Sequence, residues 1–589
     1  MNNAFKHHRH TCDLCIIGGG LAGMCAGIAA ARHGASVIIM QDRPLYGGNA
    51  SSEIRMWVSG AGGENCRETG IIEEILLENL YRNPERSYPI WDSILYEFVA
   101  KEENITSLMN CSCLDAEMDR NTILTVTGWQ TTTQSYHTVS AKYFADCSGD
   151  SILIPLTNAE YRLGREGRDE FQESIAPETP DKKTMGLSCL ISATETDRPV
   201  TYIPPTWANK YTREDLAPYR IPDMDSPAEN YWYMELGGED DSIADTEILR
   251  DKLLKVAYGI WDYIKNSGDY DADRWSLSFV GFLPGKRESR RYVGDHILTQ
   301  NEVASGGKFE DTVAFGGWPM DDHNPAGIAT KDAPNIFHPA PEQYGIPYRS
   351  LYSRNIDNLF CAGRNISATH AAMSSTRVMA TCALVGQAVG TAAAIAVKNN
   401  LSPRGVYEHR LAELKHTLME DDSFLPGNIL EPSSLTAQAR ITSDGLFPEK
   451  LINGHARPIL GEENAWIGKC GDTIEVVLEK QAYIREIRLT LDSDLNRETI
   501  GANGYMHRKC TLCNVARNTS LVHLPEALVK DLRVEISDDG KTWHVASRLT
   551  DIKRRVVYLP VGKTAKAVRV IPEASYGNET VRIFTLDVR

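Results

Sequence analysis

Three glycines near the start of the chain have the type and spacing that phosphate binding needs. Gly18, Gly20 and Gly23 form the pattern Gly-x-Gly-x-x-Gly. In that pattern the first glycine permits a tight turn, the second lets the backbone approach a pyrophosphate, and the third lets the next helix pack close to the preceding strand. The first turn of the helix also offers N–H groups and a positive dipole end to the phosphates. The glycines therefore indicate a dinucleotide site.

The residues around the glycines predict the elements that must position them. An apolar run at residues 14–17 predicts a strand, small residues up to Ala31 predict a helix that Gly34 ends, and residues 37–40 predict a second strand. A strand, a glycine turn, a helix and a second strand within about thirty residues make up the dinucleotide-binding unit. An ordinary glycine turn in an α/β protein is the alternative, which this context disfavours.

The residue that hydrogen-bonds a ribose hydroxyl is expected at the end of the second strand, about twenty residues after the glycines. Gln41 and Asp42 stand at that place, followed by Arg43. A glutamine can hydrogen-bond a ribose and an aspartate can take the acidic role, so both alternatives stay open. We count all three residues among the candidates for cofactor binding.

A second glycine-rich stretch, residues 47–52, follows the second predicted strand. We expect it to form a flexible loop beside the cofactor crevice, where Gly48, Asn49 and Ser51 are further candidates for cofactor binding. The alternative is a plain surface loop. Farther on, residues 76–83 and 91–101 predict helices, and residues 105–138 predict an antiparallel meander of short strands. An apolar strand then ends in Asp-Cys-Ser-Gly-Asp at residues 146–150.

Length and charge narrow the classes of protein to consider. A chain of 589 residues predicts two to four domains. The net charge of −17 comes without a basic block, so nucleic acid is not an expected partner. Since we find no apolar run of the ~18 residues that a membrane span needs, we do not expect a membrane partner. The first residues show no secretory signal, and we expect a cytoplasmic protein. The oligomeric state stays open.

The 13 cysteines do not form a disulfide scaffold in a chain of this length. Two Cys-x-x-Cys pairs, at residues 12–15 and 510–513, could bind zinc only if the fold brought them together. Buried structural thiols are the simpler interpretation, and we expect no metal site.

At this point the motifs resemble a known family. The glycine turn, the second glycine loop, the meander and the strand ending at residues 146–150 resemble the FAD-binding domain of glutathione-reductase-type flavoproteins. A second resembling part lies at residues 358–365 (Asn-Leu-Phe-Cys-Ala-Gly-Arg-Asn) and continues through Arg377 into a small-residue helix around residues 386–392. The resemblance implies non-covalent FAD. It adds these cofactor-binding candidates: Cys113, Gly149, Asp150, Gly363, Arg364 and Arg377.

The chain also resembles bacterial FAD-dependent oxidoreductases found with carbohydrate-utilisation enzymes. The resembling stretches are residues 164–171, 285–303, 315–325 and 344–370. Because the two FAD-binding parts are far apart in sequence, the resemblance implies an insertion between them. We predict a Rossmann-like α/β FAD-binding domain (1–160 and 346–400) with an inserted α+β substrate or cap domain (161–345), and a helix and linker at 401–435.

From residue 436 to 589 the sequence changes to short alternating segments with regular turns, which predicts an all-β sandwich. Two details resemble discoidin or galactose-binding-like, jelly-roll-like domains. They are the Asn-Gly turn at residues 453–454 with Trp466 after it, and the segment Ser-Asp-Asp-Gly-Lys-Thr-Trp at residues 537–543. Such a domain can bind glycan or act as a structural spacer, and both readings stay open.

A flavin dehydrogenase needs a base for the hydroxyl proton when hydride leaves the carbon, and histidine suits this role near pH 7. We rank His370 and His323 first, ahead of His296 and His338. His370 directly follows the segment 358–365, and His323 lies in a loop rich in Gly, Pro and Asp. Tyr348 and Arg349 are expected to approach the same place. The arginines at residues 287, 290 and 291 predict either an anion site or a structural set of ion pairs.

We therefore predict an FAD-dependent oxidoreductase that transfers hydride between a substrate C–H and flavin N5. The expected substrate is a small molecule, a sugar or glycoside oxidised at a hydroxyl carbon. One alternative is redox-assisted glycoside cleavage through a keto-sugar intermediate. A second is an NAD(P)H-fed flavin reductase or electron-transfer subunit, and a third is a non-enzymatic glycan-binding flavoprotein. The substrate, the electron acceptor and the direction stay open.

Overall fold

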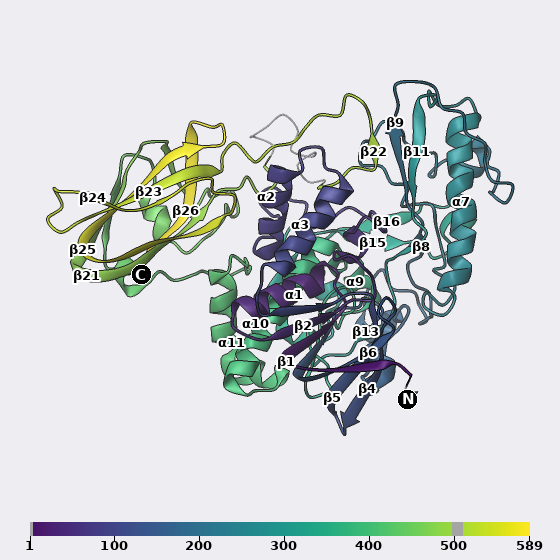
Figure 1. Cartoon of the computed structure of the whole chain (residues 1–589), viewed down its shortest axis with the longest axis horizontal. Coiled ribbons are helices and arrows are strands. Elements are labelled where there is room, and N and C mark those ends of the chain that lie inside the picture. The colour runs from purple at the N-terminus through teal and green to yellow at the C-terminus, as the bar shows by residue number, and fades with distance from the viewer. Residues whose placement is uncertain (1–3, 498–509) are drawn as a thin grey trace. The chain divides into compact units, whose positions relative to one another are not determined.

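The glycine turn joins a strand to a helix, as the sequence predicts. In the computed structural model, which describes residues 4–497 and 510–589, β1 (Lys6–Ile17) leads through the turn into α1 (Leu21–Arg32). The next strand, β2 (Val37–Met40), pairs with β1 in parallel. Figure 1 shows β1, α1 and β2 close to one another. The predicted order strand, helix, strand is confirmed, and β1 begins eight residues earlier than predicted.

These strands belong to a seven-stranded sheet with the order β3-β2-β1-β6-β5-β4, in which β18 also pairs with β6. The added strands are β3 (Ile105–Leu108), β4 (Cys111–Asp119), β5 (Thr122–Gln130), β6 (Ser135–Asp146) and β18 (Leu359–Cys361). Strands β4, β5 and β6 pair antiparallel, which confirms the meander. Strand β18 pairs with β6 in parallel, so two segments more than two hundred residues apart meet in one sheet.

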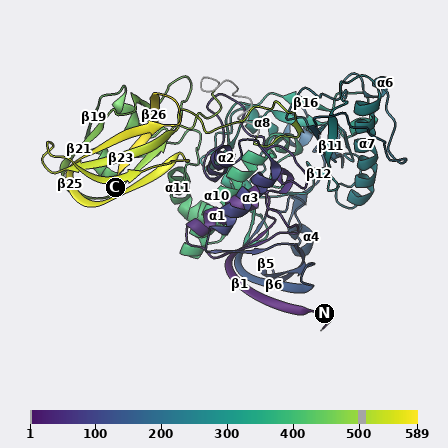
Figure 2. The same cartoon turned by 45° about the horizontal axis from the view of Figure 1, so that its top comes forward.

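Strand β6 differs from the sequence prediction because it is continuous. The sequence suggested a meander strand followed by a separate apolar strand, whereas β6 spans both. Its first part pairs with β5 and with the N-terminal half of β1, and its last part pairs with β1 and β18. Figure 2 shows the N-terminal part of β1 running beside β6. A strand with neighbours on both sides gains ladder hydrogen bonds along its whole length, which explains why it does not break.

A long apolar helix packs against α1. Helix α10 (Met379–Asn399) is 21 residues long, and a Cβ on Gly386 would lie 2.0 Å from the Ala22 carbonyl oxygen. A Cβ on Gly390 would likewise lie 2.0 Å from the Ala26 carbonyl oxygen. The two contacts are four residues apart on each helix, so they lie on one face, along which the two backbones touch. Our expectation that no segment reaches membrane-spanning length was wrong, since α10 is long and apolar enough. However, 94% of the most apolar stretch of α10 is buried inside the protein.

Replacing Gly386 with alanine is expected to destabilise this packing by about 1–3 kcal/mol, because the new methyl group must push the two backbones apart. Chemical denaturation followed by tryptophan fluorescence would measure the change. Gly405→Ala is the matched control, since the nearest atoms to its Cβ are side-chain atoms 3.3 Å away. Equal stability of the two variants would contradict the close contact.

Between β6 and β18 the chain forms small sheets and one long helix, α7 (Thr246–Asn266). Three strands that matter for the site are β8 (Leu187–Ser188), β10 (Glu235–Leu236) and β12 (Gly285–Lys286), which pair in the order β10-β8-β12. Other elements here are α4 (Leu153–Thr157), β7 (Tyr161–Arg162), α5 (Arg168–Phe171), β9 (Ile191–Glu195), α6 (Arg213–Leu216), β11 (Trp275–Val280), β13 (Arg291–Tyr292), α8 (Gln300–Ala304), β14 (Thr312–Gly316) and β17 (Tyr344–Pro347).

A short hairpin and a short helix complete the surroundings of the site. The hairpin pairs β15 (Met320–His323) with β16 (Asn335–His338), and α9 (His370–Thr376) packs against β15. Helix α9 begins at a predicted site residue, and the Thr369 side chain caps its first turn. Helix α3 (Tyr88–Ala100) and the one-turn helix η1 (Gly48–Ala50) lie near α1 and the glycine turn.

The described residues form two compact units that do not follow the order of the chain. The first contains the described parts of Met1–Ala61, Glu85–Leu414 and Lys509–Leu521. The segment at 509–521 adds β22 (Asn514–Val515) to β9 of this unit, in parallel. The second unit contains the described parts of Gly62–Pro84, Lys415–Arg508 and Val522–Arg589. The sequence did not predict either exchange of segments.

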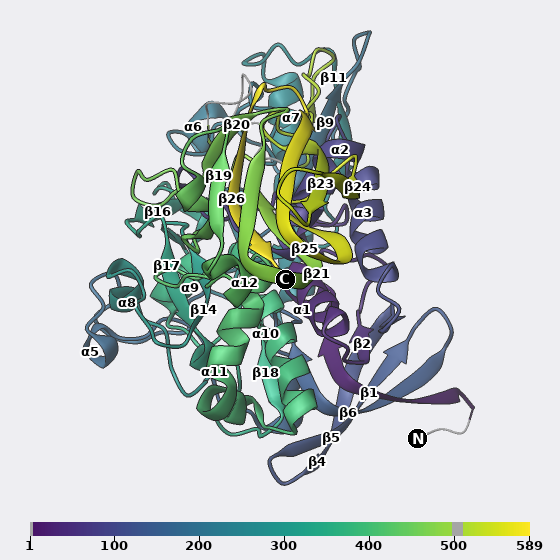
Figure 3. The same ribbon diagram turned by 90° about the vertical axis from the view of Figure 1, so that its left-hand side faces the viewer.

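The second unit is built on a seven-stranded sheet with the order β20-β26-β21-β25-β23-β24, to which β19 is added at β21. The strands are β19 (Arg440–Ser443), β20 (Trp466–Lys469), β21 (Ile474–Leu491), β23 (Val529–Ser537), β24 (His544–Leu549), β25 (Val556–Ser575) and β26 (Thr580–Val588). Figure 3 shows the long strands β21 and β25 side by side. The prediction of an all-β region is confirmed.

Two of these strands correct the sequence prediction of short segments. The sequence predicts separate strands at residues 472–480 and 484–493, which β21 joins, and at residues 554–560 and 565–572, which β25 joins. Irregularities in the pairing of β21 with β25 take the place of the expected turns. Helix α2 (Ile71–Arg82) packs into the core of this unit, where Leu77 and Leu80 join the cluster around Trp466. This burial explains why residues 62–84 belong to the second unit. Helix α11 (Pro403–Glu420) and α12 (Ser434–Ala437) precede the sheet.

Candidate active site

The glycine turn leaves room for a phosphate group only where the sequence expects one. A Cβ on Gly18 would lie 2.5 Å from the Cys147 carbonyl oxygen, and one on Gly23 would lie 1.9 Å from the Gly18 carbonyl oxygen. A Cβ on Gly20 would approach nothing closer than Gly48 Cα at 3.9 Å. Helix α1 has no side-chain cap and no acidic residue in its first turn. The first turn is therefore suited to an anion.

Gln41 holds the glycine turn in place. Its Oε1 accepts a hydrogen bond from the Gly19 N–H at 2.7 Å, and its Nε2 donates to the Leu45 carbonyl at 3.0 Å. Both ends of this buried side chain are thus used within the protein. The neighbouring Asp42 side chain is exposed, and the Arg43 guanidinium lies 3.6 Å from it. Which of these residues meets a ribose stays a prediction, although the contacts of Gln41 favour Asp42.

The second glycine loop meets β12. Gly47 pairs with Gly20 as an isolated bridge, and the Ser51 hydroxyl donates to the Gly48 carbonyl at 2.8 Å. The Asn49 side chain donates to the Lys286 carbonyl at 2.9 Å. The loop therefore joins the glycine turn to the segment that begins at Gly285.

A partly buried ion cluster connects the predicted cofactor residues after β6 with those after β18. The Asp150 carboxylate accepts from Lys286 Nζ at 2.6 Å and from Arg364 Nη2 at 2.5 Å. Arg364 also donates to the Ser289 hydroxyl, which donates to the Gly149 carbonyl. Burial alone would raise the pKa of Asp150, but the Arg364 and Lys286 cations hold it at about 2.

Replacing Asp150 with asparagine is expected to cost about 2 kcal/mol at pH 7, the free energy that corresponds to this lowered pKa. Since the folded pKa lies below the unfolded value of 3.8, the contribution is present above pH 3.8 and is lost as the pH falls towards 2. Urea denaturation of both proteins between pH 7 and pH 3 would measure the difference. A difference that does not shrink at low pH would contradict the ion cluster.

The remaining cofactor candidates have three different environments. Gly363 has φ 115°, in the region that favours glycine, and directly precedes Arg364. Cys113 is buried in the sheet core, where burial raises the pKa of its thiol to about 12. Arg377 donates to Asp321 at 3.1 Å, and its Nε is buried without a hydrogen-bond partner in the described chain.

His370 lies between two carboxylates. Its Nδ1 is 3.0 Å from Glu288 Oε1, and its Nε2 is 3.1 Å from Asp322 Oδ1. Burial alone would lower the pKa of this imidazole, but Glu288 and Asp322 raise it to about 10. His370 is therefore an imidazolium at neutral pH. Arg291 pairs with Glu288 and, at 2.8 Å, with Glu166.

His323 lies in a second cluster of the same kind. Its Nδ1 is 3.0 Å from Glu235 Oε2, and its Nε2 is 3.3 Å from Asp321 Oδ2. Arg287 pairs with Glu235 at 3.0 Å. The ring of Trp232 packs edge-on against the His323 ring, with centroids 5.1 Å apart. Because Asp321, Asp322 and His323 follow one another on β15, the two clusters are neighbours.

Residues 285–291 link the cofactor residues to both histidine clusters. Within this segment Lys286 and Ser289 reach Asp150 and Gly149, while Arg287 and Glu288 reach the His323 and His370 clusters. Arg290 donates to the Asp150 carbonyl. Arg287 and Arg291 therefore take part in internal ion pairs, which is one of the two alternatives that the sequence left open.

The other three catalytic candidates make contacts elsewhere. His296 Nε2 is 3.0 Å from Glu302 Oε1, at the first turn of α8. The buried Tyr348 hydroxyl donates to the Pro403 carbonyl, and Arg349 pairs with Asp311 at 2.9 Å. No hydrogen bond between described residues joins these three to His323 or His370. His338 lies on β16.

Sequence reasoning missed the carboxylates that hold the histidines. Glu235, Glu288, Asp321 and Asp322 were not named as site residues, although Glu288 lies between the arginines and Asp321-Asp322 directly precedes His323. One signal in the sequence could have identified these carboxylates: acidic residues next to the arginines and next to a candidate histidine. The cysteines offer no comparable cluster: none of the 13 forms a disulfide within the described chain. Among the described residues, no group of three or more His, Cys, Asp or Glu side chains could hold a metal ion.

A dinucleotide-type glycine turn, a second glycine loop and a buried imidazole site are features that an oxidoreductase with a dinucleotide cofactor would use. The chain belongs to the FAD dependent oxidoreductase family, whose model matches residues 13–418. It is an FAD-dependent oxidoreductase, and FAD is its cofactor. The non-enzymatic alternative is thereby set aside. Among curated proteins, no relative matches the chain.

The all-β C-terminal region has weak likenesses to carbohydrate-binding modules among solved structures. The family 32 module from Streptococcus pneumoniae EndoD is 15% identical, covering 27% of this chain and 99% of its own, with a TM-score of 0.20. The family 32 module of Clostridium perfringens NanJ, solved with galactose, is 10% identical, covering 27% of this chain and 97% of its own, with a TM-score of 0.19. At these scores the likenesses carry no argument about a ligand of this chain.

Proposed function

We propose that this oxidoreductase transfers hydride between FAD and a hydroxyl-bearing carbon of a carbohydrate, and that His370 moves the hydroxyl proton. The observation that carries the proposal is the imidazole of His370, held between Glu288 and Asp322 at 3.0 and 3.1 Å. One residue away from Glu288, Ser289 contacts Gly149 and Arg364, which are cofactor candidates. The histidine and the cofactor residues are thus parts of one connected set.

The residues fit the cofactor in a Rossmann-like arrangement. The first turn of α1 and the open side of Gly20 would hold the pyrophosphate, and Asp42 or Arg43 would reach the adenosine end. Gly149, Asp150, Gly363 and Arg364 would hold the segment nearer the flavin. When bound, FAD accepts or returns a hydride.

The proton is handled at His370 Nε2. The partner of this nitrogen is Asp322, the more exposed of the two carboxylates, and a substrate oxygen would take its place as hydrogen-bond acceptor. Because His370 is protonated at rest, it can donate a proton to a carbonyl oxygen in the reducing direction without a preceding step. In the oxidising direction it must first lose that proton and then acts as the base. Glu288 and Arg291 keep the ring in position throughout.

A carbohydrate suits the surroundings of His370. Asp322, which is partly exposed, is an acceptor for a hydroxyl hydrogen. Trp318, whose backbone carbonyl accepts from Ser375 on α9, has a buried indole N–H without a hydrogen-bond partner in the described chain. An aromatic ring beside carboxylates can pack against the C–H face of a sugar. The second histidine cluster favours a further candidate, redox-assisted glycoside cleavage, because elimination next to a keto group needs a second proton acceptor.

An anaerobic absorbance titration of the FAD-loaded protein would test the proposal. We expect at least one free sugar or glycoside to bleach the flavin absorbance, and product analysis would separate a keto sugar from a cleaved glycoside. Bleaching by NADH in the absence of any sugar response would instead support the reductase alternative. A full panel of sugars without any bleaching would reject the proposal.

A further inference from the structure

Glu166 completes a closed cycle of four contacts around His370. Its Oε2 accepts from the His370 backbone N–H at 2.8 Å, and its Oε1 accepts from Arg291 Nη2 at 2.8 Å. Arg291 Nη1 donates to Glu288 Oε1, the same atom that lies 3.0 Å from His370 Nδ1. All four residues are buried. Glu166 therefore acts on His370 by two routes, one through the main chain and one through Arg291.

The charges alternate in sign along the route through Arg291. Burial alone would raise the pKa of Glu166, but the Arg291 guanidinium and the His370 N–H lower it, so Glu166 is a carboxylate at neutral pH. Glu288 is shared by two cations, the Arg291 guanidinium and the His370 imidazolium. Because Glu166 balances the charge of Arg291, more of the attraction of Glu288 is left to hold the proton on His370. Water screens such interactions weakly in a buried site.

Further hydrogen bonds fix the two residues between Glu166 and the imidazole. Arg291 Nε donates to the Ala368 carbonyl at 3.0 Å, and its Nη2 also donates to the Gly164 carbonyl at 2.7 Å. Glu288 Oε2 accepts from the Met185 N–H at 3.0 Å. Since these contacts do not involve Glu166, Arg291 and Glu288 should keep their places when the charge of Glu166 is removed.

No other carboxylate in the described chain can balance Arg291 in this way. The other charged or titratable groups that face His370 or its two carboxylates are Asp322, Glu173, Arg165 and His323. Glu173 accepts from the Thr369 hydroxyl and the Gln300 N–H, both at 2.6 Å. Arg165 is paired with Asp181 at 2.5 Å. The ion pairs of Arg291 within the described chain are those with Glu288 and Glu166.

We propose that Glu166 is a positioning residue of the reaction, which fixes the backbone of His370 and, through Arg291, strengthens the hold of Glu288 on the His370 proton. The inference rests on the proposed role of His370 in proton transfer. Glu166 then favours donation of the proton to a carbonyl oxygen and opposes its loss from the imidazolium. Removing its charge should increase the fraction of His370 that is available as a base at neutral pH.

Glu166→Gln tests the proposal, because glutamine has nearly the same size and can accept from the His370 N–H but carries no charge. NMR spectra of the FAD-loaded full-length protein, with isotope-labelled histidine, would follow the His370 ring from pH 7 upwards. The signal that is lost in His370→Asn is that of His370. We expect its titration midpoint to fall by about one pH unit in Glu166→Gln from the native value of about 10.

Glu170→Gln is the matched control. Glu170 pairs with Arg162, as Glu166 does at 3.5 Å, but it contacts neither Arg291 nor His370 in the described chain. The His370 midpoint in this variant should equal the native one.

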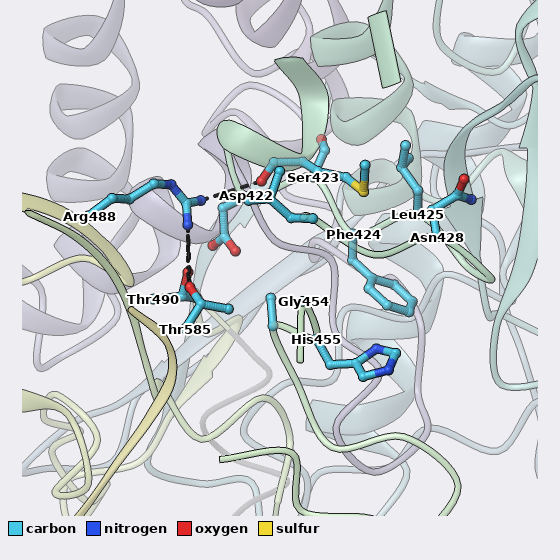
Figure 4. A pocket seen from close by; sticks show the side chains of 13 residues that line it. Asp422, Ser423, Phe424, Leu425, Asn428, Gly454, His455, Arg488, Thr490 and Thr585 are labelled. Atoms are coloured by element: carbon cyan, nitrogen blue, oxygen red, sulfur yellow. Dashed lines mark hydrogen bonds between the residues drawn. The ribbon is translucent and has the colours of Figure 1, made fainter. Parts of the chain in front are cut away.

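His455 gives a control signal within each sample. Figure 4 shows it among the residues that line a pocket, all of which belong to the second unit. Burial, followed by the Lys450 charge, lowers the pKa of His455, so its signal should stay constant from pH 7 upwards in every variant. His455→Asn assigns the signal.

Glu166→Asp is the second variant, because it keeps the charge on a shorter side chain. Its His370 midpoint should stay closer to the native value than that of Glu166→Gln. An unchanged midpoint in Glu166→Gln, or an equal fall in Glu170→Gln, would overturn the proposal. Should Glu166→Gln fail to fold with FAD, a fall of about one pH unit in Glu166→Asp would overturn it as well, since the charge is still present.

The rate of sugar oxidation separates this inference from the proposed function. At pH 8 the rate should be about tenfold higher in Glu166→Gln than in the native chain, because a fall of one pH unit in the midpoint gives about ten times more deprotonated His370. A lowered midpoint without a change in rate would count against proton transfer by His370, with the effect of Glu166 on the imidazole established. An unchanged midpoint would overturn the inference whatever the rate.

Discussion

Replacing His370 with asparagine is expected to lower kcat for sugar oxidation by about three orders of magnitude, the range found when a general acid or base is lost. Asparagine is close in size to the imidazole and can keep one hydrogen bond to Glu288 or Asp322, but it cannot carry the proton. The FAD absorbance of the purified variant should stay unchanged, because His370 is not among the residues that hold the cofactor. Stopped-flow flavin reduction at saturating sugar would measure the effect.

The pH dependence separates a proton-carrying His370 from a merely structural one. With a folded pKa of about 10, the rate of sugar oxidation should rise with pH up to that value, and the rate of the reverse reaction should fall above it. Because the folded pKa is raised above 6.5, His370 also adds stability that is complete below pH 6.5 and lost as the pH rises through about 10. The asparagine variant should show neither dependence.

His409→Asn is the matched control, since His409 is exposed on α11. Its rate and pH profile should equal those of the native chain. If His370→Asn kept the native rate and pH profile, the role of His370 in proton transfer would be disproved, whatever the stability of the variant.

The second large effect is expected for Gly20→Ala, which should weaken FAD binding at least about 100-fold, or about 2.7 kcal/mol. The nearest atom to the new Cβ is 3.9 Å away, so the protein without FAD should fold as before. The methyl group would instead occupy space that the pyrophosphate needs beside the first turn of α1. Equilibrium dialysis with FAD and thermal unfolding without FAD would measure the two quantities separately.

Gly62→Ala is a suitable control because a Cβ there would approach no atom within 4 Å. Gly23→Ala provides the opposite comparison, since its Cβ would lie 1.9 Å from the Gly18 carbonyl oxygen and should disturb the fold itself. Unchanged FAD affinity in Gly20→Ala would show that the cofactor phosphates do not bind at this turn.

Local sequence patterns predicted the elements around the cofactor well. The second strand begins and ends where predicted, at Val37 and Met40, because apolar residues are bounded by a glycine on one side and polar residues on the other. The meander was predicted in a similar way, from short strand segments separated by turn residues. These signals involve only a few neighbouring residues, so they can be recognised without knowledge of the tertiary structure.

Continuity of strands was harder to predict, because it depends on partners. Strands β6, β21 and β25 each run through a point where the sequence suggested an interruption. Neighbouring strands supply hydrogen bonds across those points and outweigh weak local turn preferences. The assignment of segments to the two units has a similar origin. Residues 62–84 belong to the second unit because Leu77 is buried in its core, and β22 belongs to the first unit because it pairs with β9. Both contacts join segments that are distant in sequence.

By itself, the sequence determined the glycine turn, because spacing and residue type carry that information, and its motifs resembled the family to which the chain belongs. The ranking of His370 and His323 as site residues stays a prediction. Only the tertiary structure decided the state of those histidines. Glu288 and Asp322 lie 82 and 48 residues from His370 in sequence, yet both are within hydrogen-bonding distance of its ring. Electrostatic interactions depend on separation in space and on burial, so the proton on His370 follows from the fold.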